Sequence, residues 1–256
     1  MGMVPSWSLG KTAMNYTNIV LAIPHSVGQL TCRCPNPKVN ALRLQFTDWF
    51  TDELFSIDDP GVAAIKCPLS RLEVDAERLE HEEDRLCNFA ILSGNAVAHS
   101  IWNRSLAAWF KYRADLLEAT AAGERPLIID CHSYPQGIGD DIDICLGFNE
   151  DASRPSDATL ESVAGLFRKN GYAVGINTPY SNAIAPVGYR GHSLMIEINK
   201  RCYMDEARLE KTEGFVRLHD ILASLYRMLR ASFPAMRRKG RRLAGNHANV
   251  SASRPQ

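Results

Sequence analysis

The sequence lacks the features that mark membrane proteins and disulfide-rich secreted proteins. None of its apolar runs approaches the roughly 20 residues that a membrane-spanning helix needs. The N-terminus shows no basic start followed by an apolar core and a small-residue cleavage site. The seven cysteines are an odd number at irregular positions, which does not indicate a disulfide framework. We therefore expect a cytoplasmic protein with reduced thiols and no membrane partner.

An excess of charge of either sign is also missing. Lysine and arginine together number 29, and so do aspartate and glutamate, so the formal net charge is zero. A balanced chain has no global field that attracts nucleic acid or an anionic membrane, so any recognition of charge must be local. We expect no nucleic-acid partner, and the sequence leaves the oligomeric state open.

The length and composition are those of an ordinary globular chain. Of its 256 residues, 45% are hydrophobic and 23% are charged, which is enough for one substantial core. We predict a single catalytic α/β domain over residues 1–234. Residues 235–256 contain a cluster of basic residues and few core-forming ones, so we expect a flexible tail there.

The most informative stretch is a predicted strand that ends in polar residues. An apolar run at residues 127–129 is followed at once by Asp130 and His132. A buried strand has this pattern where its C-terminal end opens into a site, because ligands of α/β sheets bind at that end. Residues 18–23 form a second apolar run, which is followed by His25. Both histidines are therefore candidate functional residues.

The remaining pattern alternates between strands and helices, which favours an α/β fold. Apolar runs and alternation predict further strands at residues 62–65, 141–148, 171–177 and 193–199. Helical spacing predicts helices at residues 40–55 (at least from Thr47, a possible cap), 95–122, 157–169 and 205–231. Residues 70–85 are the most charged part of the chain, and such a run is by default a solvated face with local ion pairs.

Acidic residues on two of these elements are candidates for a site. Glu197 interrupts the apolar strand predicted at residues 193–199, and an uncompensated buried carboxylate is costly, so it must be paired, protonated or placed at a site. It either forms a structural pair with a nearby arginine such as Arg201 or acts as a general base. Asp48 and Asp52 are four residues apart and would share a helix face, as solvated residues or with one of them as a metal ligand.

Five short motifs occur in order along the chain. They are Pro24-His25-Ser26, Thr47-Asp48-Trp49 with Asp52-Glu53-Leu54, Ser70-Arg71-Leu72-Glu73-Val74-Asp75 with Arg78, Asp130-Cys131-His132-Ser133, and Met195-Ile196-Glu197-Ile198-Asn199 with Tyr203-Met204-Asp205-Glu206. With these motifs, about residues 18–206 of the chain resemble the N-formylglutamate amidohydrolase family. That family is similar in fold to the zinc carboxypeptidases, which implies a three-layer α/β sandwich with a mixed central β-sheet flanked by helices.

The resemblance implies a zinc site and roles for the residues around it. His25 and His132 would bind one Zn²⁺ ion, and Asp48, with Asp52 as the alternative, would supply the third ligand. Glu197 would be the catalytic residue that takes a proton from the attacking water. Substrate binding would fall to Arg71, Arg78, Asn177 and Arg190.

The implied activity is hydrolysis of the amide of an N-acyl amino acid. An N-formyl substrate such as N-formyl-L-glutamate would yield the free amino acid and formate, as in histidine catabolism. The chain departs from the family pattern Asp-Leu-Asn-Arg, because it reads Asp75-Ala76-Glu77-Arg78, and the extra acid would disfavour a dicarboxylic product. The alternatives are a zinc carboxypeptidase or amidase of the same fold acting on another acyl amino acid or peptide, and a metal-free binding paralogue.

Overall fold

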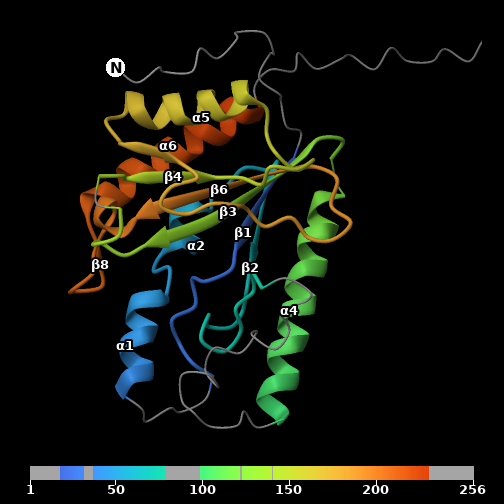
Figure 1. The fold of residues 1–256 in the computed structure, drawn as a ribbon, viewed down its shortest axis with the longest axis vertical. Helices are drawn as coiled ribbons and strands as arrows, with labels where there is room; N and C mark the ends of the chain where they lie inside the picture. Colours follow the sequence, from blue (N-terminus) through green and yellow to red (C-terminus); the bar gives the residue numbers. More distant parts are fainter. Residues whose placement is uncertain (1–17, 32–36, 79–98, 122, 140, 231–256) are drawn as a thin grey trace, which may run out of the picture.

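A mixed six-stranded sheet forms the centre of the molecule (Figure 1). The computed structural model describes residues 18–31, 37–78, 99–121, 123–139 and 141–230. The strand order is β2-β1-β3-β6-β4-β5. The bounds are β1 Asn18–Ile23, β2 Val62–Lys66, β3 Pro126–Tyr134, β4 Ile144–Gly147, β5 Val174–Ile176 and β6 His192–Asn199. Strand β4 runs antiparallel to β6, whereas β1, β2, β3 and β6 are mutually parallel.

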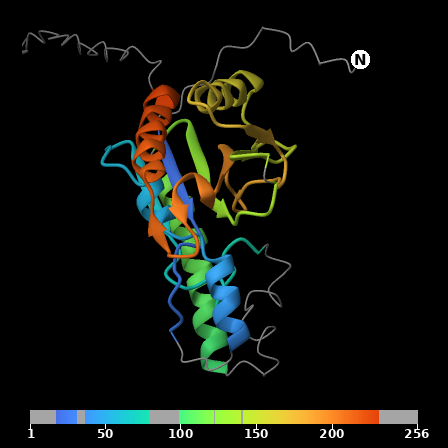
Figure 2. The same cartoon turned by 90° about the vertical axis from the view of Figure 1, so that its left-hand side faces the viewer.

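Helices cover both faces of this sheet, which confirms the predicted α/β class. They are α1 (Pro37–Phe46), α2 (Thr51–Phe55), α4 (His99–Thr120), α5 (Asp157–Lys169) and α6 (Glu213–Arg230). A small hairpin of β7 (Met204–Asp205) and β8 (Glu210–Lys211) precedes α6. Figure 2 shows α5 and α6 at one end of the molecule and α1 and α4 extending at the other. Within the described ranges, no helix combines the length and apolarity needed to cross a membrane.

The three layers follow from the alternation of side chains along the strands. In β1, Ile19, Leu21 and Ile23 pack into a core with α2, α5 and α6, while Val20 and Ala22 face a second core with α4. Successive residues of a strand point to opposite faces, so a strand that is apolar throughout must be covered on both sides. This continuous apolar pattern fits the places of β1 and β3 inside the sheet, where each has a neighbouring strand on both sides.

The prediction of one helix over residues 40–55 is wrong in its middle. Helix α1 ends at Phe46 and α2 begins at Thr51. Between them Phe50 adopts a left-handed conformation (φ 64°), which a helix interior does not tolerate. Thr47 does not cap a helix, because its hydroxyl donates to the carbonyl oxygen of Arg43. Similarly, the helix predicted from residue 205 begins only at Glu213, after the β7-β8 hairpin.

The prediction that the charged segment is a solvated face is wrong for its described part. Glu73 and Asp75 are buried. Glu73 accepts hydrogen bonds from the backbone N–H and the hydroxyl of Thr31 and pairs with Arg104. These partners compensate the burial of the charge, and they lie far away in the sequence. Residues 79–85 of this segment and the tail predicted at 235–256 lie outside the described residues.

Substitution of Trp109 by alanine should cost about 3–5 kcal/mol of unfolding free energy, because it empties the core under α4. Trp109 is 1% exposed, and its indole N–H donates to the carbonyl oxygen of Arg78. Urea unfolding measures the loss. The neighbouring Phe110 is 54% exposed, so Phe110→Ala should change the stability by no more than about 0.5 kcal/mol. Equal losses in the two variants would contradict this packing.

Candidate functional site

Two histidines meet at the carboxyl ends of neighbouring parallel strands. Ala22 of β1 pairs with Asp130 of β3, so His25, just beyond β1, comes level with His132, near the end of β3. The two imidazole rings lie 5.1 Å apart between centroids. Both histidines are buried. The sheet therefore brings together two potential metal-binding nitrogens from positions more than a hundred residues apart.

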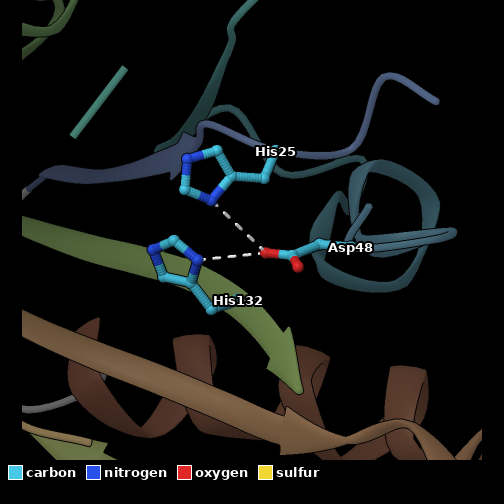
Figure 3. A group of neighbouring side chains, drawn as sticks. All are labelled: His25, Asp48 and His132. Atoms are coloured by element: carbon cyan, nitrogen blue, oxygen red, sulfur yellow. Dashed lines mark hydrogen bonds and ion pairs between the residues drawn. The ribbon is translucent and has the colours of Figure 1, made fainter. Parts of the chain in front are cut away.

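Asp48 completes a group of three possible metal ligands (Figure 3). Its Oδ2 atom lies 3.0 Å from Nδ1 of His132 and 3.8 Å from Nδ1 of His25. One donor atom from each residue lies within 4.8 Å of the others. Nδ1 of His25 is buried and makes no hydrogen bond to any described residue. A buried nitrogen normally has a hydrogen-bond partner. A metal ion between His25, Asp48 and His132 would give this nitrogen a partner.

The break between α1 and α2 places Asp48 at the histidines. The backbone N–H of Asp48 donates to the carbonyl oxygen of His25 at 3.0 Å. Lys200, directly after β6, donates to Gln45, and the hydroxyl of Tyr203 donates to Trp49. The segment around Asp48 is thus held from both sides by residues at the end of a central strand.

Asp52, the alternative carboxylate in the sequence, lies elsewhere. It forms an ion pair with Lys66 at the end of β2. The structure therefore brings Asp48, and not Asp52, to the two histidines.

Further carboxylates contact the opposite nitrogen of each histidine. Nε2 of His25 lies 3.0 Å from Asp75, and Nε2 of His132 lies 3.1 Å from Asp130. Carboxylates in this position fix the ring orientation and raise the basicity of the other nitrogen. Glu77 adds a third contact, with its Oε1 atom 2.8 Å from Nε2 of His132.

The charges at this centre shift its pKa values strongly. Burial lowers the pKa of His132, but Glu77 and Asp130 outweigh burial and raise that pKa well above its usual value. Burial raises the pKa of Asp48, but the hydrogen bond from His132 and the nearby imidazole of His25 outweigh it and leave the pKa below the usual range. The surrounding carboxylates favour protonated imidazoles when no metal is bound. A divalent cation can replace those protons.

A cavity of about 670 Å³ opens beside the three ligands. Glu197 lines it from β6, where the strand register sets this residue opposite His132. The side chain is 8% exposed, and Oε2 makes no hydrogen bond to the described part of the chain. Burial, reinforced by Asp48 and Glu77 and opposed by His132, raises the pKa of Glu197 to about 8. The alternative of a structural pair with Arg201 is not observed, because Arg201 binds Asp143.

Only one of the predicted substrate-binding residues lines the cavity. Arg71 is among the lining residues. The guanidinium of Arg78 pairs with Asp75 at 3.1 Å. Asn177 lies in a turn after β5 with φ 51° and accepts a hydrogen bond from the backbone N–H of Phe148. Arg190 is exposed. None of the last three is among the residues that line the cavity.

Arg113, which was not predicted as a site residue from the sequence, lines the cavity from α4. This side chain is buried, with 6% exposed; its guanidinium stacks 4.6 Å from the Trp109 ring centroid and donates to the carbonyl oxygen of Arg78. Its position next to Tyr112, in the apolar stripe of α4, was the available signal. A buried arginine on a core-facing helix needs a polar environment, and the cavity provides one.

A known protein family matches most of the chain. The family model described as N-formylglutamate amidohydrolase matches residues 17–204. The chain belongs to the N-formylglutamate amidohydrolase family. The matched region includes His25, Asp48, His132 and Glu197, so the candidate site of this family member lies within the part that defines the family.

Solved structures show the same fold. The N-formylglutamate amidohydrolase from Ralstonia eutropha superposes with a TM-score of 0.69 at 21% sequence identity, over 86% of this chain and 95% of that chain. A gene product from Agrobacterium tumefaciens has a TM-score of 0.50 at 14% identity, over 85% of this chain and 91% of that chain. No curated protein matches this member of the N-formylglutamate amidohydrolase family at a significant level.

Proposed function

We propose that the chain is a zinc-dependent amidohydrolase that cleaves the amide bond of an N-acyl amino acid. A formyl group is the proposed acyl group, so that an N-formyl amino acid would give formate and the free amino acid. The observation that carries this proposal is the group of His25, Asp48 and His132 beside Glu197, whose buried Oε2 atom has no hydrogen-bond partner among the described residues.

The three ligands fit a catalytic zinc ion. Two imidazole nitrogens and one carboxylate form a known catalytic zinc set, which leaves a further position for water or substrate. His25 and His132 would bind through Nδ1, the nitrogen that faces Asp48 in each ring. When bound, zinc supplies Lewis acidity, which polarises the amide carbonyl and makes water acidic near neutral pH.

Glu197 would carry the proton between the water and the amine. Its Oε2 atom is buried at the cavity and has no protein partner among the described residues, so it is available to a water molecule there. The water's oxygen would bond to the acyl carbon as Glu197 takes its proton, and the same proton would pass to the amine nitrogen as the C–N bond breaks. Burial raises the pKa of this carboxyl, but a divalent cation nearby would lower it, so that the group can be ionised to take the proton and can still return it to the amine.

Arg71 and Arg113 are the proposed partners of the substrate's α-carboxylate. Both guanidinium groups line the cavity that contains Glu197. A guanidinium binds a carboxylate with two parallel hydrogen bonds, which orients the substrate as well as binding it. Arg78 would act indirectly, through its ion pair with Asp75, the carboxylate that contacts His25.

Two measurements test the proposal. The first is the zinc content of the purified protein, with one ion per chain expected. The second is hydrolysis of a panel of N-acyl amino acids that includes N-formyl-L-glutamate, N-acetyl amino acids and dipeptides. Activity on peptides or larger acyl groups alone would favour an amidase or carboxypeptidase of the same fold. A protein that binds no metal and hydrolyses none of these compounds would be a binding paralogue.

Replacement of Asp75 by asparagine should weaken zinc binding by about 10- to 100-fold, because the orienting carboxylate of His25 is lost. A titration against a coloured chelator measures this affinity. Asp143→Asn is the matched control, because Asp143 binds Arg201 and does not line the cavity. An affinity of Asp75→Asn equal to that of the wild type would show that this carboxylate does not support a metal ligand.

A further inference from the structure

Glu77 is a second acid that reaches the two histidines. Its Oε1 atom lies 2.8 Å from Nε2 of His132, and its Oε2 atom lies 3.9 Å from Nδ1 of His25. Asp48 contacts the other nitrogen of His132, so the two carboxylates approach one ring from different sides. The side chain of Glu77 is 30% exposed and lines the cavity. The carboxylate of Glu77 is therefore only partly covered by its partners, and Glu77 lies at the space that a substrate would enter.

Negative charge dominates the walls of this cavity. Arg71 and Arg113 are the two guanidinium groups among the lining residues. Five carboxylates line the same space: Asp48, Glu77, Asp130, Asp151 and Glu197. Even a divalent cation at the histidines leaves carboxylates in excess of cations, so the walls have no surplus positive charge for a substrate with two carboxylates.

The guanidinium groups of Arg71 and Arg113 already interact with other groups of the protein. Arg71 lies 3.8 Å from Asp75 and feels the charges of Asp48, Glu77 and Glu197. Arg113 donates to the carbonyl oxygen of Arg78 and stacks on Trp109. Together they can receive the single α-carboxylate of an N-acyl amino acid. A second carboxylate would have to approach Glu77, and like charges at short distance repel.

We propose that the negative charge of Glu77 determines which substrates this site accepts. The site selects N-acyl amino acids whose α-carboxylate is their only negative charge. The side chain of the preferred substrate is neutral or positively charged, and N-acyl derivatives of aspartate and glutamate are excluded. This inference rests on the proposed function and names its substrate class.

The test compares two substrates of equal size. For the zinc-loaded wild type, kcat/KM should be at least ~10-fold higher for N-formyl-L-glutamine than for N-formyl-L-glutamate. Glu77→Gln should lower this preference by at least ~10-fold, because the amide keeps the shape and removes the charge. The ratio of the two kcat/KM values cancels any difference in zinc loading between the proteins. Glu53→Gln makes the same change outside the cavity and should keep the wild-type ratio.

A wild type that prefers N-formyl-L-glutamate, or a ratio unchanged by Glu77→Gln, would overturn the inference. If neither compound is hydrolysed, the proposed function fails, and calorimetric binding of the same two compounds to the zinc-loaded protein tests the inference independently. Tighter binding of N-formyl-L-glutamine, with the difference reduced in Glu77→Gln, would support it. Equal affinities in the wild type would overturn it.

Discussion

Glu197→Gln should lower kcat for N-formyl amino acid hydrolysis by about 10²- to 10⁴-fold, the range for loss of a positioned general acid–base. The amide fills the same space but can neither take a proton from water nor return it to the amine. The zinc content should stay at the wild-type level, because Glu197 is not one of the three grouped ligands. Steady-state kinetics on the faster of the two N-formyl substrates, with metal analysis of the same samples, measures both quantities.

Glu161→Gln is the control for this experiment. It makes the same chemical change on the exposed face of α5, where Glu161 pairs with Arg168, so its kcat should equal that of the wild type. Two outcomes would contradict the role of Glu197. Full activity in Glu197→Gln would show that another group moves the proton, and loss of zinc from this variant would make Glu197 part of the metal site.

The parts of the site on central strands were accessible from the sequence. Strand β1 was predicted with its observed bounds, β6 was predicted to within one residue, and the apolar run predicted at residues 127–129 lies within the longer β3, because fully buried strands form continuous apolar runs. Polar residues that follow such runs stand at the carboxyl edge of parallel strands, which explains why His25 and His132 meet. Glu197 was identifiable by its cost inside an apolar run, and the structure confirms its burial.

The sequence pattern alone could not decide whether Asp48 or Asp52 lies beside the two histidines. Asp48 and Asp52 look equivalent on a regular helix, and the choice depends on the left-handed turn at Phe50. That turn is held by Lys200 and Tyr203, some 150 residues later in the chain. Local periodicity contains no information about such partners, so tertiary contacts override the helical pattern.

Side-chain direction, which the sequence does not show, explains the wrong prediction for the charged segment and the observed positions of the arginines near the motifs. A run of alternating charges resembles a solvated face, but Glu73 and Asp75 are buried because Thr31, Arg104 and His25 lie beside them in space. The sequence could name arginines near the motifs, yet it could not show that Arg78 turns to Asp75 or that Arg113 reaches the cavity from α4. The position of Arg113 depends on the packing of α4 against the sheet.

Asp48→Asn should weaken zinc binding by at least ~100-fold, because a neutral amide replaces the carboxylate that lies near Nδ1 of both histidines. The melting temperature gives a readout that does not depend on activity. At a free zinc concentration of 100 times Kd, binding stabilises the wild type by about 2.7 kcal/mol, whereas Asp48→Asn at the same concentration should gain little.

Asp52→Asn separates loss of the ligand from a general change of charge. It removes a carboxylate from the same stretch of chain but one that pairs with Lys66, away from the histidines. Its zinc affinity and its zinc-dependent rise in melting temperature should therefore match those of the wild type. The reverse pattern, with zinc kept by Asp48→Asn and lost by Asp52→Asn, would mean that the turn at Phe50 does not set the third ligand.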